Sequence, residues 1–401
     1  MYSTIRAISL LILMHFSAEG ALERVYVGSI DEHSVSLAWG TANGRFTNTI
    51  GRQAEGLGVV EIQVGERKFT ETKAWIRVNG LLADTEYVYQ VRSAGKTLGK
   101  GKIRTWPEKS QDLTFFVIGD WGNGSKMQYD LAAAMETERL KQEAAGKRVR
   151  FVMSTGDNIY HGGNKDLDWE AKFFVPYAAT LSSIPFYAVL GNHDGNESES
   201  ASDLPTYLDN FFSPKGPMTR WYHFSYGGFA EFFALDSTVN QYPGARTAAY
   251  LANGEQSKWL EKSLQAKPLA WRVAYLHHPI FTAGPNHRPA MDDLSHWFKL
   301  FQKHGVTSVF AGHEHNLQFS ERSKSTGGIQ FVVSGAGGEL RRSSIRHKMV
   351  ERKIAAWAPQ IHFLVVNIKD EVMSVQPVGF ERIQLRNAMG EIVATPILLG
   401  R

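Results

Sequence analysis

The chain has 401 residues, long enough for more than one domain with a core of its own. Hydrophobic residues make up 43% of it, including 10 Trp, 14 Tyr and 23 Phe, which is typical of a globular protein and excludes a disordered or fibrous one. The 44 basic and 40 acidic residues leave a net charge of +4, far from the basic surface that nucleic-acid binding requires. We therefore expect a small anionic substrate and no nucleic acid.

Residues 1–20 have the anatomy of a signal peptide. Arg6 precedes an apolar run from Ala7 to Phe16, and small residues follow at Ala18 and Gly20. The run is too short for a permanent membrane anchor, and no later stretch is long and uncharged enough for one. We expect a secreted or periplasmic protein without a stable membrane anchor; the alternative is an uncleaved interfacial helix. Because the chain has no cysteine, core packing must hold the fold together, and bound metal is a further candidate support.

Residues 21–108 are predicted to form an all-β domain. Short alternating runs such as RVYVGSI, SVSLAWG and EYVYQVRS are bounded by Gly, Asn or Asp, a spacing typical of a β-sandwich. Trp39 and Tyr87 resemble the fibronectin type III pattern, with Tyr87 as a candidate tyrosine corner, and both residues also fit a plain packing role. The polar stretch PEKSQD, residues 107–112, marks the end of this domain.

Residues 112–385 follow a different rhythm. Strands such as LTFFVIGD, VRFVMSTGD and WRVAYLHHP alternate with segments of helical periodicity, for example residues 125–143. This alternation predicts an α/β domain whose strands are buried on both faces. Three later runs, IQFVVSGAG, FLVVNIKD and VMSVQPVGF, predict an antiparallel edge of the sheet. Residues 386–401 are expected to form a C-terminal tail.

Five strands of this domain end in residues that bind metal ions. The motifs are GDWG, GDNIY, GNHD, HHP and GHEH. Because open α/β sheets place their sites at the carboxyl ends of strands, these motifs are expected to converge. They offer carboxylates, a phenol, an amide oxygen and imidazoles without a thiolate, a donor set that suits iron, manganese, magnesium or zinc. The residues therefore indicate a two-metal hydrolase.

In this order the motifs resemble the signature of the metallophosphoesterases. Tyr160, three residues after Asp157, is similar to the mark of the purple acid phosphatases, and SGAGG at 334–338 is similar to the closing loop of that family. The match covers about residues 115–338. The β domain resembles the accessory domain of the plant-type members, whereas GDWG and GDNIY are closer to the small mammalian-type members. The resemblance implies an α/β fold in which helices flank a metallophosphoesterase β-sandwich core, preceded by an all-β fibronectin III-like sandwich.

The resemblance also implies which residues form the site. It implies that a ferric ion would be held by Asp120, Tyr160 and His315. A divalent ion (iron, zinc or manganese) would be held by Asn192, His277 and His313, and Asp157 would bridge the two ions. His193 and His287 would contact the phosphate or protonate the leaving group, with Asn286 as the alternative to His287. Glu314 and Asp194 are expected to orient neighbouring imidazoles, and His278 to support the site or pack.

The sequence therefore predicts an exported acid phosphatase that hydrolyses phosphate monoesters with a hydroxide held by two metal ions as the nucleophile. A phosphodiesterase or nucleotidase on the same core is the nearest alternative. The alternative from a different class is a surface-binding module whose metal domain is structural. Because none of the metal motifs precedes residue 115, we expect the β domain to be dispensable for the chemistry.

Overall fold

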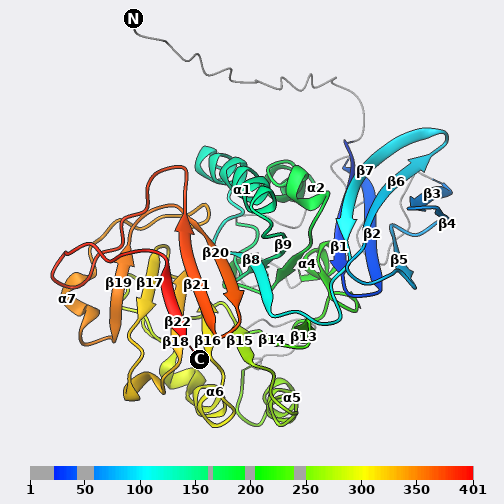
Figure 1. The fold of residues 1–401 in the computed structure, drawn as a ribbon. Helices are drawn as coiled ribbons and strands as arrows, with labels where there is room; N and C mark the ends of the chain where they lie inside the picture. Colours follow the sequence, from blue (N-terminus) through cyan, green and yellow to red (C-terminus); the bar gives the residue numbers. More distant parts are fainter. Residues whose placement is uncertain (1–21, 43–57, 161–165, 195–203, 239–249, 401) are drawn as a thin grey trace, which may run out of the picture.

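The computed structural model describes residues 22–42, 58–160, 166–194, 204–238 and 250–400. The predicted signal peptide lies outside the described residues. Figure 1 shows a small unit made of strands beside a larger unit of sheets and helices, and the change from one to the other falls between Arg104 and Asp112. Among the described residues, none of the helices is both long and apolar enough to cross a membrane.

The N-terminal β unit (described residues 22–42 and 58–106) consists of two antiparallel sheets. One sheet contains β1 (Leu22–Ile30), β2 (Ser34–Ala42) and β5 (Trp75–Asn79); the other contains β4 (Arg67–Glu71), β3 (Val60–Val64), β6 (Glu86–Ser93) and β7 (Lys96–Arg104). Trp39 is fully buried, which agrees with a packing role. The Tyr87 hydroxyl accepts a hydrogen bond from the Leu82 amide at 2.9 Å, as in a tyrosine corner. The all-β prediction is confirmed.

The α/β unit (residues 112–400) is built on two stacked sheets. The first sheet contains, in spatial order, β10 (Phe186–Ala188), β9 (Val149–Ser154), β8 (Asp112–Ile118), β20 (Phe363–Lys369), β21 (Val372–Val378) and β22 (Ile397–Gly400). The second contains β13 (Tyr222–Tyr226), β14 (Ala230–Ala234), β15 (Trp271–Tyr275), β16 (Ser308–Ala311), β18 (Gln330–Ser334), β17 (Leu317–Ser320) and β19 (Ile354–Ala358). Phe115 and Phe151 of the first sheet meet Phe232 of the second at ring distances of 5.4 and 5.3 Å. The core therefore lies between the sheets.

Strand directions follow the predicted pattern. β8, β9 and β10 are parallel, whereas β20, β21 and β22 extend the first sheet antiparallel. In the second sheet β14, β15, β16 and β18 are parallel and the outer strands are antiparallel. The predicted antiparallel edge is confirmed for FLVVNIKD and VMSVQPVGF, which form β20 and β21. It is wrong for IQFVVSGAG, which forms β18 of the second sheet and is parallel to β16. The segment predicted as a C-terminal tail, 386–401, contributes β22, which pairs with β21 from Val372 to Val375, so it is better described as the last strand of the sheet.

Helices cover the outer faces of both sheets. Figure 1 shows α1 (Lys126–Ala144) on the side of the first sheet and α5 (Glu255–Leu264) and α6 (Met291–Lys303) on the side of the second. The shorter elements are α2 (Asp166–Trp169), a π-helix (Glu170–Phe174), α3 (Ala178–Leu181), a 3-10 helix (Asn192–Asp194), α4 (Leu204–Asn210), β11 (Phe212–Ser213), β12 (Gly216–Pro217), a 3-10 helix (Lys324–Thr326) and α7 (Arg346–Met349).

Two polar side chains explain where these helices begin and how they are attached. Ser125 caps α1 by accepting a hydrogen bond from the Gln128 amide at 3.3 Å, which satisfies one of the free amides of the first turn. The buried Arg272 of β15 donates to the carbonyls of Leu264 and His304 at 2.9 and 2.8 Å. Because these carbonyls lie at the ends of α5 and α6, one cation ties both helices to the second sheet.

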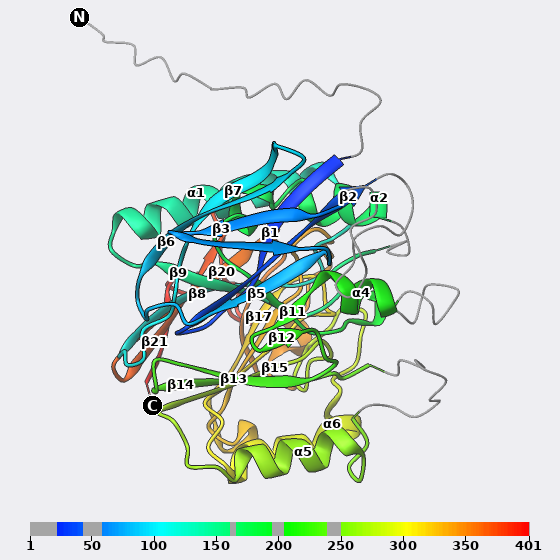
Figure 2. The same cartoon turned by 90° about the vertical axis from the view of Figure 1, so that its right-hand side faces the viewer.

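The N-terminal β unit packs closely on the α/β unit, and in Figure 2 it lies in front of the sheets. Trp106, 1% exposed, is surrounded by the rings of Phe151, Tyr187, Phe224 and Tyr226 at 5.3–6.1 Å. The Tyr187 hydroxyl is bonded to both the amide and the carbonyl of Ile30. The junction is therefore a buried aromatic interface.

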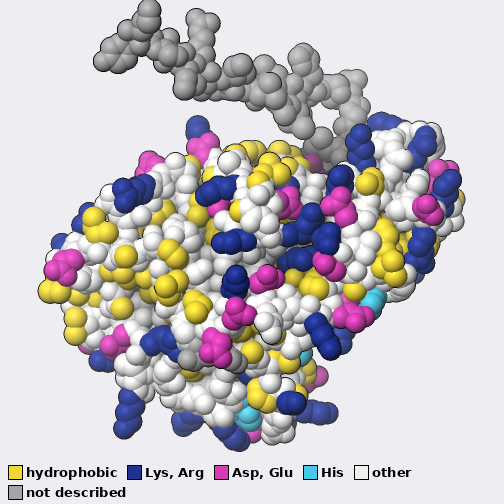
Figure 3. Space-filling model, in the orientation of Figure 1, with side chains coloured by type: hydrophobic (Ala, Val, Ile, Leu, Met, Phe, Trp, Pro, Cys, Tyr) yellow, Lys and Arg dark blue, Asp and Glu magenta, His cyan; other side chains and the backbone are white. Residues whose placement is uncertain are grey.

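Charged side chains surround this interface. Arg148 and Arg150, at the start of β9, pair with Glu86 and Asp84 of the N-terminal β unit at 3.1 and 3.5 Å. Figure 3 shows Lys and Arg side chains interspersed with Asp and Glu side chains over this face of the molecule. Exposed pairs of this kind each contribute only about 0–1 kcal/mol, so the aromatic interface dominates the docking of the two units.

Candidate metal centre

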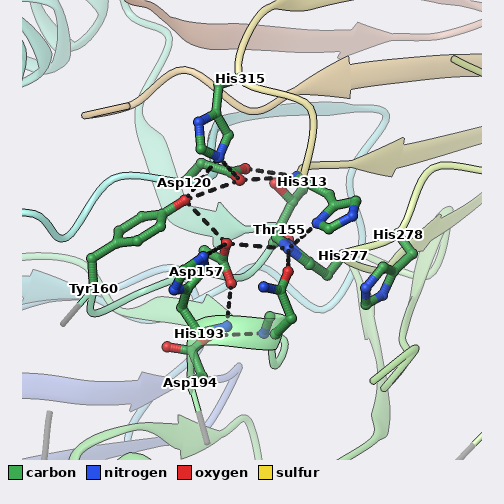
Figure 4. Close-up of polar contacts among 12 residues, drawn as sticks. Asp120, Thr155, Asp157, Tyr160, His193, Asp194, His277, His278, His313 and His315 are labelled. Atoms are coloured by element: carbon green, nitrogen blue, oxygen red, sulfur yellow. Dashed lines mark hydrogen bonds and ion pairs between the residues drawn. The ribbon is translucent and has the colours of Figure 1, made fainter. Parts of the chain in front are cut away.

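The predicted ligands meet where the ends of the two sheets adjoin. Asp120 follows β8, Asp157 follows β9 and Asn192 lies after β10, whereas His277 follows β15 and His313 follows β16. Figure 4 shows the carboxylates, the phenol and the imidazoles pointing toward one another from the two sides. All seven predicted ligands belong to the described residues.

One cluster surrounds the Tyr160 hydroxyl. This oxygen lies 3.2 Å from Asp120 Oδ1, 3.0 Å from Asp157 Oδ2 and 3.2 Å from His315 Nε2. Asp120 and Asp157 are at most 1% exposed. One donor atom each from Asp120, Asp157 and His315 lies within 4.8 Å of the others, a spacing that suits a metal ion.

A second cluster surrounds His277 Nε2. It lies 3.0 Å from Asn192 Oδ1, 3.3 Å from Asp157 Oδ2 and 3.2 Å from His313 Nδ1. On the other side of the ring, Nδ1 donates to the Thr155 carbonyl at 2.9 Å. A neutral His277 therefore presents a lone pair on Nε2 toward the cluster. Asp157 Oδ2 belongs to both clusters.

The donor atoms of both clusters fit bound cations, because acceptors face acceptors. Asn192 Oδ1, Asp157 Oδ2 and a neutral His277 Nε2 have no hydrogen to share, and the single hydrogen of the Tyr160 hydroxyl cannot serve three partners. Burial and the carboxylates of Asp120 and Asp157 raise the pKa of the Tyr160 phenol well above its usual value. Burial alone would lower the pKa of His277, but Asp157 and Asp120 raise it to about 9, so the surroundings of His277 Nε2 favour a positive charge.

The surroundings of His313 keep its imidazole neutral. Burial, together with the neighbouring imidazoles of His277 and His278, holds the pKa of His313 far below its usual range. The ring is therefore neutral and keeps a lone pair for a metal ion. Its amide donates to both oxygens of Asp120 at 3.0 and 2.9 Å, so one motif fixes the carboxylate of another.

The backbone of the site is unusual. Seven non-glycine residues in the described part of the chain have positive φ, and three of them are Asp120, Asp157 and His313, at +55°, +51° and +69°. Residues other than glycine seldom adopt a positive φ, because the backbone is strained there, and residues with this strain cluster at functional sites. The positive φ turns the side chains of Asp120, Asp157 and His313 toward one another directly after the strands that precede them.

Both predicted substrate-side residues lie at the site. The His193 ring is 4.4 Å from the Tyr160 ring, its Nε2 is 3.9 Å from Asp157 Oδ2, and its side chain is 18% exposed. The His287 ring packs against the His313 ring, with 3.8 Å between the centroids and a tilt of 34°, and burial lowers the pKa of His287. His287, His278 and His313 line a cavity of about 330 Å3.

His278, which was expected to support the site or pack, lies beside it. Its Nδ1 is 3.0 Å from the Ser237 hydroxyl, and its ring is 4.5 Å from His313. Burial lowers the pKa of His278 to about 3. The ring is therefore neutral over the usual pH range and lines the cavity without adding charge.

The prediction that Asp194 and Glu314 orient imidazole rings is wrong, because both carboxylates bind main-chain amides. Asp194 accepts from the amides of Asn158, Ile159 and Gly191, and burial next to Asp157 raises its pKa to about 7. Glu314 accepts from the amides of Asn286 and His287 at 3.1 and 2.8 Å. The loops that carry the motifs leave amides without strand partners, and these carboxylates satisfy them. No residue-type pattern signals such bonds.

Two mixed sheets with this donor set at their joined ends are the arrangement of a metallophosphoesterase. Residues 113–317 match the family model of the calcineurin-like phosphoesterases, and the chain belongs to that family. It is 27% identical over 273 residues to purple acid phosphatase 17 of Arabidopsis thaliana, which covers 62% of this chain and 75% of that protein. It is also 27% identical over 278 residues to tartrate-resistant acid phosphatase type 5 of Rattus norvegicus, covering 63% and 79%.

Solved structures show the same fold. PhoD superposes with a TM-score of 0.65 at 15% identity, covering 93% of this chain and 92% of that one. The purple acid phosphatase PPD1 of Lupinus luteus superposes with a TM-score of 0.62 at 14% identity, covering 93% and 73%. The predicted resemblance to the purple acid phosphatases is confirmed, and the chain is a calcineurin-like phosphoesterase.

The substitution Gly191→Ala tests how tightly the site is packed. A Cβ at Gly191 would lie 2.1 Å from both the amide nitrogen and Oδ1 of Asp157, so the shared carboxylate must move. We expect metal affinity to fall about 10–100-fold, as when the support of a ligand is lost. Plasma mass spectrometry of the protein after dialysis against graded metal concentrations measures it. Gly400→Ala, with nothing within 4 Å of the added Cβ, is the control. Equal affinities in the two variants would contradict the packing argument.

Proposed function

We propose that the protein is an exported acid phosphatase that hydrolyses phosphate monoesters at a centre of one ferric and one divalent ion. The observation that carries the proposal is the Tyr160 hydroxyl, buried among two carboxylates and an imidazole at 3.0–3.2 Å. A phenol in such surroundings ionises only if a strongly charged cation displaces its proton. The expected export rests on the predicted signal peptide.

The two clusters support the following ligand assignment. Asp120, Tyr160 and His315 would hold the ferric ion, Asn192, His277 and His313 would hold the divalent ion, and Asp157 would serve both. Asp157 Oδ2 lies 3.0 Å from the Tyr160 hydroxyl and 3.3 Å from His277 Nε2, so one carboxylate reaches both clusters. The bound metal ions would neutralise the phosphate ester and acidify the water that attacks it. The divalent ion is iron, zinc or manganese.

The side chains of His193 and His287 supply the remaining functions. His193 lies beside Asn192 and is partly exposed, so its Nε2 can donate a hydrogen bond to the phosphate or a proton to the leaving oxygen. His287 packs against His313 at the wall of the cavity. A cavity of about 330 Å3 supports a small ester as the substrate. A phosphodiesterase is the nearest alternative. Its substrate carries two organic groups on the phosphate, whereas a monoester carries one.

Visible spectroscopy tests the ferric site. Protein loaded with ferric iron should be coloured by charge transfer from the Tyr160 phenolate, and Tyr160→Phe should lose that band because no phenolate remains. Tyr87→Phe, which removes a hydroxyl of the N-terminal β unit that accepts from the Leu82 amide, should keep it. An iron-loaded wild type with the same spectrum as Tyr160→Phe would rule out Tyr160 as a ligand.

Turnover of the His193→Ala variant tests the substrate side. Loss of an acid or hydrogen-bond donor at the phosphate should lower kcat for a phosphate monoester by about 10²–10⁴-fold while bound metal stays at the wild-type level. The control is His33→Ala, whose imidazole is exposed in the N-terminal β unit. An unchanged kcat at every pH would remove His193 from the reaction. A diester hydrolysed faster than the monoester by the wild type would favour the alternative.

A further inference from the structure

The π-helix Glu170–Phe174 lies between the N-terminal β unit and the candidate metal centre. π-Helical turns are rare and occur mostly at functional sites. Glu170, Phe173 and Phe174 are buried, whereas Lys172 faces the loop that carries Tyr160. The proposed function gives this helix no role.

The N-terminal β unit holds one side of the π-helix. Arg24 of β1 donates through Nη1 to Glu170 Oε2 at 3.0 Å, and the two side chains are only 5% and 9% exposed. The Arg24 guanidinium also lies 4.2 Å from the centre of the Phe174 ring, and Tyr26 packs on the same ring at 5.0 Å. Loss of one partner of a buried charge pair leaves the other charge uncompensated and strongly destabilises the fold. The pair of Arg24 and Glu170 therefore holds the π-helix against β1.

The α/β unit holds the other side. Gln128 of α1 is fully buried and donates through Nε2 to the Lys172 carbonyl at 2.5 Å, while its Oε1 accepts from the Gly124 amide at 2.7 Å. The Phe173 ring packs on Trp121 of the GDWG motif at 5.5 Å. The backbone of Lys172 is therefore anchored, and its side chain starts from a fixed point.

From that point Lys172 reaches the main chain of a proposed metal ligand. Its ammonium donates to the Tyr160 carbonyl at 2.7 Å, and its side chain is 14% exposed. On the other side of the residue, the Tyr160 amide donates to the Gly122 carbonyl at 2.8 Å. The Tyr160 backbone is thus held at both its amide and its carbonyl, and the position of the phenol among Asp120 and Asp157 follows from it.

We propose that Lys172 is a positioning residue for Tyr160, and that the N-terminal β unit keeps Lys172 in place through Arg24 and Glu170. The role as a metal-site residue rests on the proposed function, because it requires Tyr160 to be a ligand. The β unit then contributes to the site, contrary to the expectation that it is dispensable for the chemistry.

Hydrogen exchange of the metal-free, full-length protein tests the positioning directly. In Lys172→Met the Tyr160 amide should exchange about tenfold faster, as expected from the loss of one hydrogen bond to a charged group. Lys172→Arg should restore most of the protection, and Arg24→Met should show the same effect in weaker form. Lys126→Met, which removes an exposed lysine of α1, is the control. Wild-type exchange at Tyr160 in both Lys172→Met and Arg24→Met would overturn the proposal.

The iron-loaded protein gives a second readout. Lys172→Met should shift the phenolate-to-iron band or reduce the iron bound per chain, whereas Lys172→Arg and Lys126→Met should match the wild type. An unchanged band and unchanged iron content in Lys172→Met would remove the link from Lys172 to the metal site. A colourless iron-loaded wild type would instead contradict the proposed ligation by Tyr160, and the exchange experiment would still decide whether Lys172 holds that residue.

Discussion

The constraint on which the site depends is the burial of two carboxylates, Asp120 and Asp157, at the joined ends of two sheets. Charge taken out of water must be compensated by hydrogen bonds and by positive charge. The amides of His193 and His313 supply some of the hydrogen bonds. They also lock motifs from different strands to each other. The rest of the negative charge of Asp120 and Asp157 must be compensated by cations, because most of the other atoms around the two carboxylates are hydrogen-bond acceptors.

The sequence predicted which side chains converge better than it predicted the contacts that support them. Asp120 and Asp157 could be brought together because they follow two neighbouring parallel strands, β8 and β9, whose carboxyl ends share one edge of a sheet. His277 follows β15 of the second sheet, so only its place in the ordered motifs joined it to them. Asp194 and Glu314 could not be assigned correctly, because their partners are main-chain amides and the side chains of Asn158 and Arg341, whose positions depend on the loop conformation. The pairing of β22 with β21 was missed for a related reason: a four-residue strand has too short a pattern to reveal a distant partner.

The relation between the two units changes the view of the N-terminal β unit as an accessory. Trp106, two residues after the end of β7, is buried among four aromatic rings of the α/β unit. Arg24 reaches the π-helix that carries Lys172, and Lys172 reaches Tyr160. The metal motifs all lie in the α/β unit, yet the contacts that fix one proposed ligand extend beyond it. The position proposed for the Tyr160 side chain therefore depends on contacts in both units.

The central claim, that the two clusters hold two different metal ions around a shared Asp157, is tested most directly by anomalous diffraction. Crystals of the protein loaded with iron and zinc would be measured at the absorption edge of each metal. The account predicts an iron peak in contact with the Tyr160 hydroxyl and His315 Nε2, and a zinc peak at about 2.0–2.2 Å from Asn192 Oδ1 and His277 Nε2. A single peak, or two peaks of which neither contacts Asp157, would contradict it.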